Sequence, residues 1–71
     1  MKVKEILNME AEELQRMMTD EEFNRMKELG FEYAWQLLDM MKDGVRASDM
    51  EDDEEYTTIS EYLDYVEEMR G

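Results

Sequence analysis

Residues 31–43 read FEYAWQLLDMMKD, and this stretch decides the fold of the chain. On a helical wheel its apolar side chains cover most of the circumference and leave one polar strip, made of Glu32, Gln36 and Asp39. A helix with so wide an apolar surface needs neighbours on two sides. The sequence therefore predicts a central helix over 31–43 that ends at Gly44, a typical glycine C-cap.

The composition of the rest of the chain also favours helices. None of the 71 residues is Pro and only three are Gly, whereas Leu, Met, Glu and Lys, which form helices readily, are abundant. A chain this short buries only about 60% of its unfolded surface and forms one small domain. We predict an all-α fold over residues 1–71, a small bundle of three to four short helices with an acidic loop before the last helix.

Capping signals place the helices that precede the central one. Asn8 followed by several acids predicts a helix over about 9–18, while residues 2–7 remain ambiguous. The sequence TDEE at 19–22 is a capping box, in which the Thr hydroxyl and the second Glu carboxylate each satisfy a backbone amide. This box predicts the start of another helix, and Gly30 predicts its end.

The chain changes character at residue 46. Residues 46–57 carry six acids and almost nothing to bury, so we interpret them as a solvated acidic linker after a helical core over 1–45. The sequence TISE at 58–61 is a second capping box, and it opens an amphipathic acidic helix over 58–70. Its apolar face is made of Ile59, Tyr62, Leu63, Val66 and Met69, and we expect it to pack on the central helix through Ile59, Leu63 and Val66.

The charge is strongly negative and unevenly distributed. Eight Lys and Arg against 21 Asp and Glu give a net charge of -13, and residues 48–71 hold ten of the acids but only one base. A surface of this sign excludes direct binding to nucleic acid, because phosphates would be repelled. The excess charge in the last third exceeds what solubility requires, so this part is the candidate binding surface.

Acids and tyrosines alternate along this surface, since Tyr56, Tyr62 and Tyr65 lie among the carboxylates. Carboxylates on the last helix recur about every turn, or ~5 Å, which is within a factor of two of phosphate spacing. We interpret the surface as a nucleic-acid mimic that occupies a basic groove on a partner protein, such as a nuclease. Its predicted contact residues are Asp52, Asp53, Glu54, Glu55, Glu61, Asp64, Tyr65, Glu67 and Glu68. The alternative is an ordinary solvated surface.

A different class of function stays open. Nine Met and one Trp are present, and flexible thioethers suit either gap filling in a small core or an adaptable binding face. In this second hypothesis the protein is a helical adaptor or an antitoxin-like partner that binds through Trp35, Met40 and Met41. A homodimer that covers the central helix, or a structural role in a larger assembly, also fits the pattern.

The absence of His and Cys excludes most catalytic and metal chemistry. The acidic run has no glycine and no D-x-D-x-D-G order, so we expect no specific metal site, no cofactor and no enzymatic activity. The N-terminal stretch over 1–7 is charged and lacks a long apolar segment, which predicts neither a signal peptide nor a membrane span. We therefore expect a cytoplasmic protein with no membrane partner.

Three resemblances bear on function. The pattern F-x-x-M-x-x-L-G-F over 23–31, followed by Ala34 and Leu37-Leu38, resembles the first helices and Gly-Phe loop of ubiquitin-associated domains. The same stretch resembles a helix-turn-helix, but its second helix would present carboxylates to DNA, which excludes that role. By size, helicity and acidity the chain resembles the small anti-restriction and anti-CRISPR inhibitors of phages. This last resemblance implies a viral protein acting in the host cytoplasm.

Overall fold

The computed structural model describes residues 1–70 and confirms the all-α prediction. This part of the chain forms five helices, namely α1 (Val3–Asn8), α2 (Ala11–Met17), α3 (Asp20–Glu28), α4 (Ala34–Ser48) and α5 (Ile59–Arg70). The count exceeds the expected three to four because the ambiguous N-terminal residues form α1. Asn8 is the last residue of α1 and not the cap of the next helix, which begins at Ala11 after the N-cap Glu10. Lys2 and Glu55 form an isolated β-bridge.

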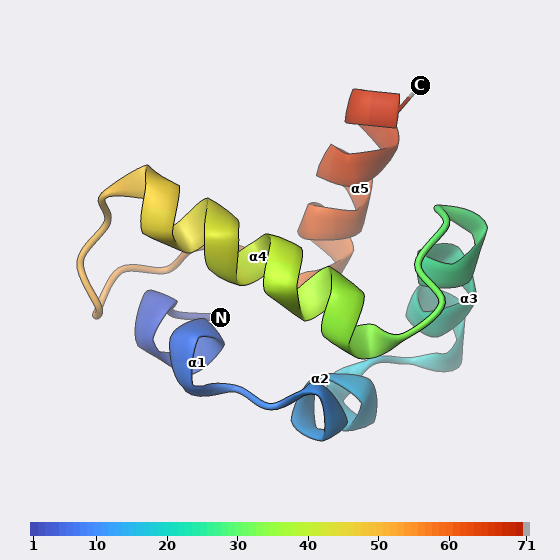
Figure 1. Ribbon diagram of the computed structural model, residues 1–71, viewed down its shortest axis with the longest axis horizontal. Coiled ribbons are helices and arrows are strands. Elements are labelled where there is room, and N and C mark those ends of the chain that lie inside the picture. The colour runs from blue at the N-terminus through green and yellow to red at the C-terminus, as the bar shows by residue number, and fades with distance from the viewer. Residues whose placement is uncertain (71) are drawn as a thin grey trace.

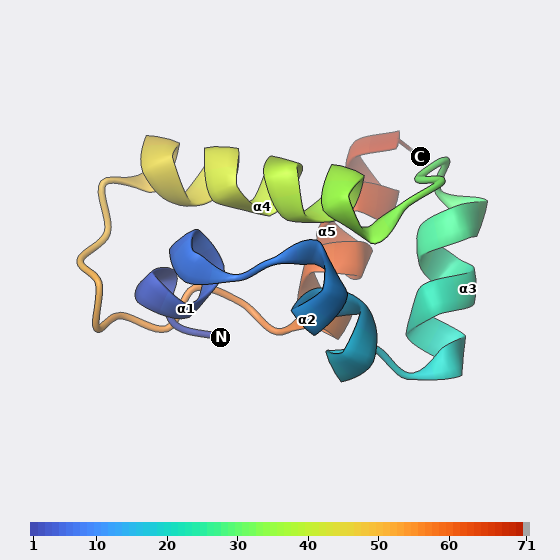
Figure 2. The same ribbon diagram turned by 60° about the horizontal axis from the view of Figure 1, so that its bottom comes forward.

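The helix α4 is the longest element and lies across the molecule (Figure 1). It packs against α1 and α2, while α5 packs most extensively against α3. The contact between the last helix and the central one, expected from the sequence, is therefore not the most extensive contact that α5 makes. Figure 2 shows the acidic segment returning from the end of α4, past the N-terminus, to the start of α5.

One hydrophobic core unites the helices, and among residues 1–70 no polar or charged residue is buried in it. The buried residues are Val3, Ile6, Met9, Leu14, Met26, Phe31, Ala34, Leu37, Leu38, Met41, Val45, Ile59, Tyr62, Leu63 and Val66. Four of the five residues on the predicted apolar face of α5 are in this list. The exception is Met69, which is 58% exposed because it lies in the last turn, where α5 projects past α4 (Figure 1).

The ends of α3 match the predicted signals. The Thr19 hydroxyl accepts a hydrogen bond from the amide of Glu22 at 3.1 Å, and the Glu22 carboxylate accepts from the Thr19 amide at 2.9 Å. At the other end Gly30 adopts a φ of 100°. The amides of Gly30 and Phe31 donate to the carbonyls of Lys27 and Met26, which is a Schellman motif. Both the capping box and the glycine cap are confirmed.

The bounds of α4 differ from the prediction at both ends. It begins at Ala34, because the side-chain oxygen of Gln36 accepts hydrogen bonds from two preceding amides and holds them outside the helix. It continues through Gly44 to Ser48 and ends at Asp49, which adopts the left-handed conformation with a φ of 59°. Gly44 therefore lies inside the helix and not at its end, and the Tyr56 hydroxyl occupies the space that a Cβ atom would need there.

Candidate functional site

The acidic segment before α5 is bound to the N-terminus of the chain by backbone hydrogen bonds. The amides of Val3 and Lys4 donate to the carbonyls of Glu54 and Asp52, at 3.0 and 3.2 Å. These are the first amides of α1, which have no acceptor inside their own helix. The segment predicted to be a solvated linker thus caps α1 with its backbone, while its acidic side chains remain exposed.

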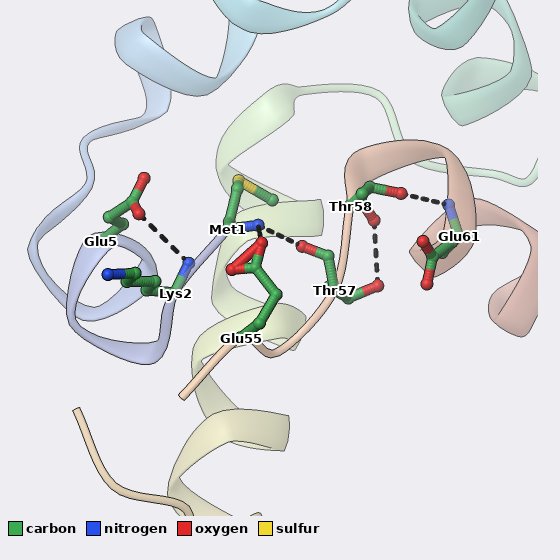
Figure 3. Close-up of polar contacts among 7 residues, drawn as sticks. All are labelled: Met1, Lys2, Glu5, Glu55, Thr57, Thr58 and Glu61. Carbon is green, nitrogen blue, oxygen red and sulfur yellow. Dashed lines mark hydrogen bonds and ion pairs between the residues drawn. The ribbon is translucent and has the colours of Figure 1, made fainter. Parts of the chain in front are cut away.

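The charged N-terminus adds a second attachment (Figure 3). The ammonium group of Met1 donates to a carboxylate oxygen of Glu55 at 2.9 Å and to the carbonyl of Thr57 at 2.7 Å. The amide of Tyr56 donates back to the carbonyl of Met1 at 2.9 Å. Residues 55–57, which lead into α5, are therefore fixed by hydrogen bonds to both the ammonium group and the carbonyl of Met1.

Three more predicted contact residues have partners within this segment or beside it. The Lys4 ammonium lies 3.4 Å from a carboxylate oxygen of Asp53. The Glu54 carboxylate accepts from the amide of Glu51 at 2.9 Å and closes a turn. Asp52 contributes its carbonyl to α1, as described above, and its carboxylate forms no ion pair within residues 1–70. The segment is a folded acidic loop with carboxylates at fixed positions.

The acids of α5 fall into two groups. Arg25 of α3 donates to Asp64 and Glu67, each at 2.8 Å, and these two hydrogen bonds raise the pKa of the guanidinium above its ordinary value. Glu61 and Glu68 are exposed and form no ion pair in the described part of the chain. Asp64 and Glu67 therefore connect α3 to α5, whereas Glu61 and Glu68 carry uncompensated charge on the solvent side.

Tyr65 lies beside these free carboxylates and is 51% exposed. Next to it is a hollow of about 310 Å³, lined by Tyr56, Thr57, Glu61, Tyr62 and Tyr65. We call it the tyrosine hollow. The rings of Tyr62 and Tyr65 are 5.7 Å apart and tilted by 47°. The sequence shows that these tyrosines lie among the acids. The hollow itself forms only when the acidic loop docks, and no pattern in the neighbouring sequence predicts that docking.

Burial and nearby charges raise the pKa of two of the tyrosines. Burial, followed by the charges of Tyr56, Tyr65 and Asp43, raises the pKa of Tyr62 to about 12. The pKa of Tyr56 is also raised, chiefly by burial. Tyrosine is neutral at physiological pH even without such a shift, so Glu61 supplies the one formal charge among the residues lining the hollow.

The alternative apolar interface is only partly available. Met41 is fully buried in the core and has no surface to offer a partner, so its prediction as an interface residue is wrong. Met40 is half-buried against the core. Trp35 is 51% exposed and stacks with Tyr33, which is 58% exposed, at a ring separation of 6.4 Å. Sequence analysis did not identify Tyr33, since a helix over 31–43 would have turned it inward.

Within residues 1–70 no group of three or more acids is arranged to hold a metal ion. None of the helices described is long and apolar enough to cross a membrane.

No family model, curated protein or solved structure matches this chain. The argument for function therefore rests on the chemistry of its surface.

Proposed function

We propose that this protein binds a basic surface of a partner protein, such as a groove that holds nucleic acid, and inhibits or regulates the partner by occupying it. The observation that carries the proposal is the concentration of acids in the last third of the chain. Residues 48–71 contain ten acids and one base. Most of these acids lie on the folded loop and on the outer side of α5.

The folded state of the acidic loop strengthens this proposal. A flexible acidic tail would lose conformational entropy on binding, and that loss would reduce its affinity. Here the loop backbone is already held by Val3, Lys4 and the ammonium of Met1. A partner with matching Lys and Arg side chains would meet carboxylates at fixed positions. The net charge of the chain would also accelerate the encounter at low salt.

The predicted contact residues contribute unequally under this proposal. Among the acids of α5, Glu61 and Glu68 contribute most, because no internal cation offsets their charge among the described residues. Glu55 and Asp53 contribute less, since the Met1 ammonium and Lys4 already neutralise part of their field. Asp64 and Glu67 are weakened in the same way by Arg25. Tyr65 supplies apolar contact area beside the free carboxylates.

The test is a pull-down from nuclease-treated native lysate, eluted with stepwise salt, using a tag at the C-terminus so that the Met1 ammonium stays free. The site variant is Glu61→Lys with Glu68→Lys. The matched control is Glu13→Lys with Glu28→Lys, which changes the charge equally on exposed residues of α2 and α3 that form no ion pair in residues 1–70. Circular dichroism confirms that both variants fold.

We expect the wild type and the control to retain a nucleic-acid-binding protein that elutes at moderate salt, and the site variant to lose it. Charge-driven binding weakens steeply with salt, because the Debye length shrinks to about 3 Å at 1 M. Equal retention by both variants would contradict the proposal.

A second candidate is an adaptor that docks a partner on the exposed, stacked pair Tyr33 and Trp35. Apolar docking changes little with salt. This candidate therefore predicts a partner that survives high salt and is lost when Trp35→Ala is introduced. The same salt elution separates the two functions.

A further inference from the structure

We propose that the tyrosine hollow receives one arginine side chain of the basic partner and anchors it against Glu61. This inference rests on the proposed function and names the contact that gives the acidic surface its specificity. The hollow lies where the docked loop meets the first two turns of α5, and its lining comes from Tyr56 and Thr57 of the loop and from three residues of α5.

The first observation is the buried Tyr62, which is only 4% exposed and lines the hollow. Its hydroxyl makes no hydrogen bond within residues 1–70. In the same part of the chain no fully buried side-chain oxygen or nitrogen lacks a partner. The small accessible area of this side chain must therefore include the hydroxyl, whose hydrogen-bonding capacity is free.

The second observation is the combination of aromatic rings with one carboxylate. Tyr62 and Tyr65 meet at 5.7 Å with tilted rings, and Tyr65 is half exposed. Aromatic faces attract cations, and this attraction increases when the cation is partly desolvated. Glu61 lies on the rim and has no internal cation among the residues described. Both features exclude an anionic occupant and favour a cation.

The chemistry of the lining favours arginine over lysine. A guanidinium is planar, stacks on aromatic rings and is weakly hydrated, so it enters a half-buried aromatic hollow at a lower cost. Its fork of N–H donors matches a carboxylate, and its further donors can reach a hydroxyl oxygen. The lining supplies both kinds of acceptor, a carboxylate at Glu61 and hydroxyl oxygens on the tyrosines. A lysine ammonium is compact and strongly hydrated and uses this geometry less well.

The molecule provides its own example of this contact elsewhere. The guanidinium of Arg70 lies over the ring of Phe31, 5.0 Å from its centroid, and the ammonium of Lys27 lies 4.8 Å from the centroid of Phe23. The exposed rings of Tyr33 and Trp35 stack on each other. Within residues 1–70 no cation lies over the ring of Tyr65, which therefore remains available to an external one.

The experiment is an NMR titration of the whole chain with N-acetyl-argininamide, N-acetyl-lysinamide and N-acetyl-citrullinamide as probes. The first two carry the same charge, and citrulline has nearly the shape of arginine without the charge. We expect saturable shifts confined to residues 56–65 with the arginine probe. We also expect affinity at least about threefold weaker for lysine, and no saturable shift for citrulline.

Two variants test the lining separately. Tyr65→Ala should weaken the affinity for the arginine probe by about two- to fivefold, which corresponds to the loss of one exposed cation–π contact. Glu61→Gln, which keeps the shape of the side chain, should reduce the preference for charged probes over citrulline. The control is Tyr33→Ala, which removes an aromatic ring of similar exposure that does not line the hollow and should change nothing.

The outcomes separate this inference from the proposed function. Equal shifts with arginine and lysine, or shifts spread over all acids, would overturn the arginine anchor. If the arginine probe gives no saturable shift while the variant with Glu61→Lys and Glu68→Lys still loses its partner, the arginine anchor is wrong and the proposed function stands. If that variant keeps its partner, the proposed function fails first. Loss of the partner with Tyr65→Ala but not with Tyr33→Ala would support both.

Discussion

The contact between Gly44 and Tyr56 allows a sharp test of how the acidic loop docks. A Cβ atom placed on Gly44 would overlap the Tyr56 hydroxyl oxygen, and it would lie 3.5 Å from the ring carbon Cζ. The first contact requires movement, whereas the second is an ordinary van der Waals contact. The substitution Gly44→Ala should therefore have opposite effects in the wild type and in a Tyr56→Phe background, where the hydroxyl is absent.

The magnitudes follow from two competing terms. Alanine is favoured over glycine inside a helix by roughly 0.5–1 kcal/mol. Forcing an extra methyl group into filled space costs roughly 1–3 kcal/mol. In the wild type we expect Gly44→Ala to destabilise the protein by about 0.5–2 kcal/mol. In the Tyr56→Phe background we expect a stabilisation of about 0.5–1 kcal/mol from the helix term alone.

The assay is urea denaturation of the four proteins of this double-mutant cycle, followed by far-ultraviolet circular dichroism. Tyr56→Phe alone should be close to neutral, because the hydroxyl makes no hydrogen bond within residues 1–70. The coupling between the two sites should be about 1–3 kcal/mol. If Gly44→Ala stabilises the wild-type protein, or if the coupling energy is near zero, Tyr56 does not pack on α4.

Two further predictions concern α5. Arg25→Met should lower the melting temperature by a few degrees at low salt and by less at high salt, because it removes the ion pairs to Asp64 and Glu67; a salt-independent loss would contradict this. The pKa of Tyr62 is raised from 10.0 to about 12, so its contribution to stability is complete below pH 10 and is lost as the pH rises toward 12. Urea denaturation should show this fall, at less than about 1.4 kcal/mol per pH unit, and Tyr62→Phe should reduce it.

Features set by neighbouring residues could be predicted from the sequence. The capping box at Thr19 and the Schellman motif at Gly30 each involve side chains and amides within a few residues. The burial of Ile59, Leu63 and Val66 on one face of α5 also followed from helical periodicity. Local hydrogen bonds and a 3.6-residue period leave a recognisable pattern in the sequence, which is why these predictions succeeded.

Features set by distant residues could not be predicted. The amide of Val3 donates to the carbonyl of Glu54, and such backbone bonds carry no side-chain signature. Gly44 looks like a helix end until Tyr56 is placed against it. Likewise, the predicted acidic contact residues looked equivalent until α3 brought Arg25 to two of them. In each case the missing information was the relative position of two elements.

The same distant contacts explain how a chain with a net charge of -13 holds its acids on a compact fold. Three cationic groups, the Met1 ammonium, Lys4 and Arg25, cross-link the loop and α5 to the remaining helices. Each neutralises part of the acidic field and at the same time fixes its neighbours in place. The carboxylates left over, such as Glu61 and Glu68, therefore lie on a rigid surface. Under the proposed function, a basic partner would gain their attraction without the entropy cost of ordering them, which a disordered acidic tail could not offer.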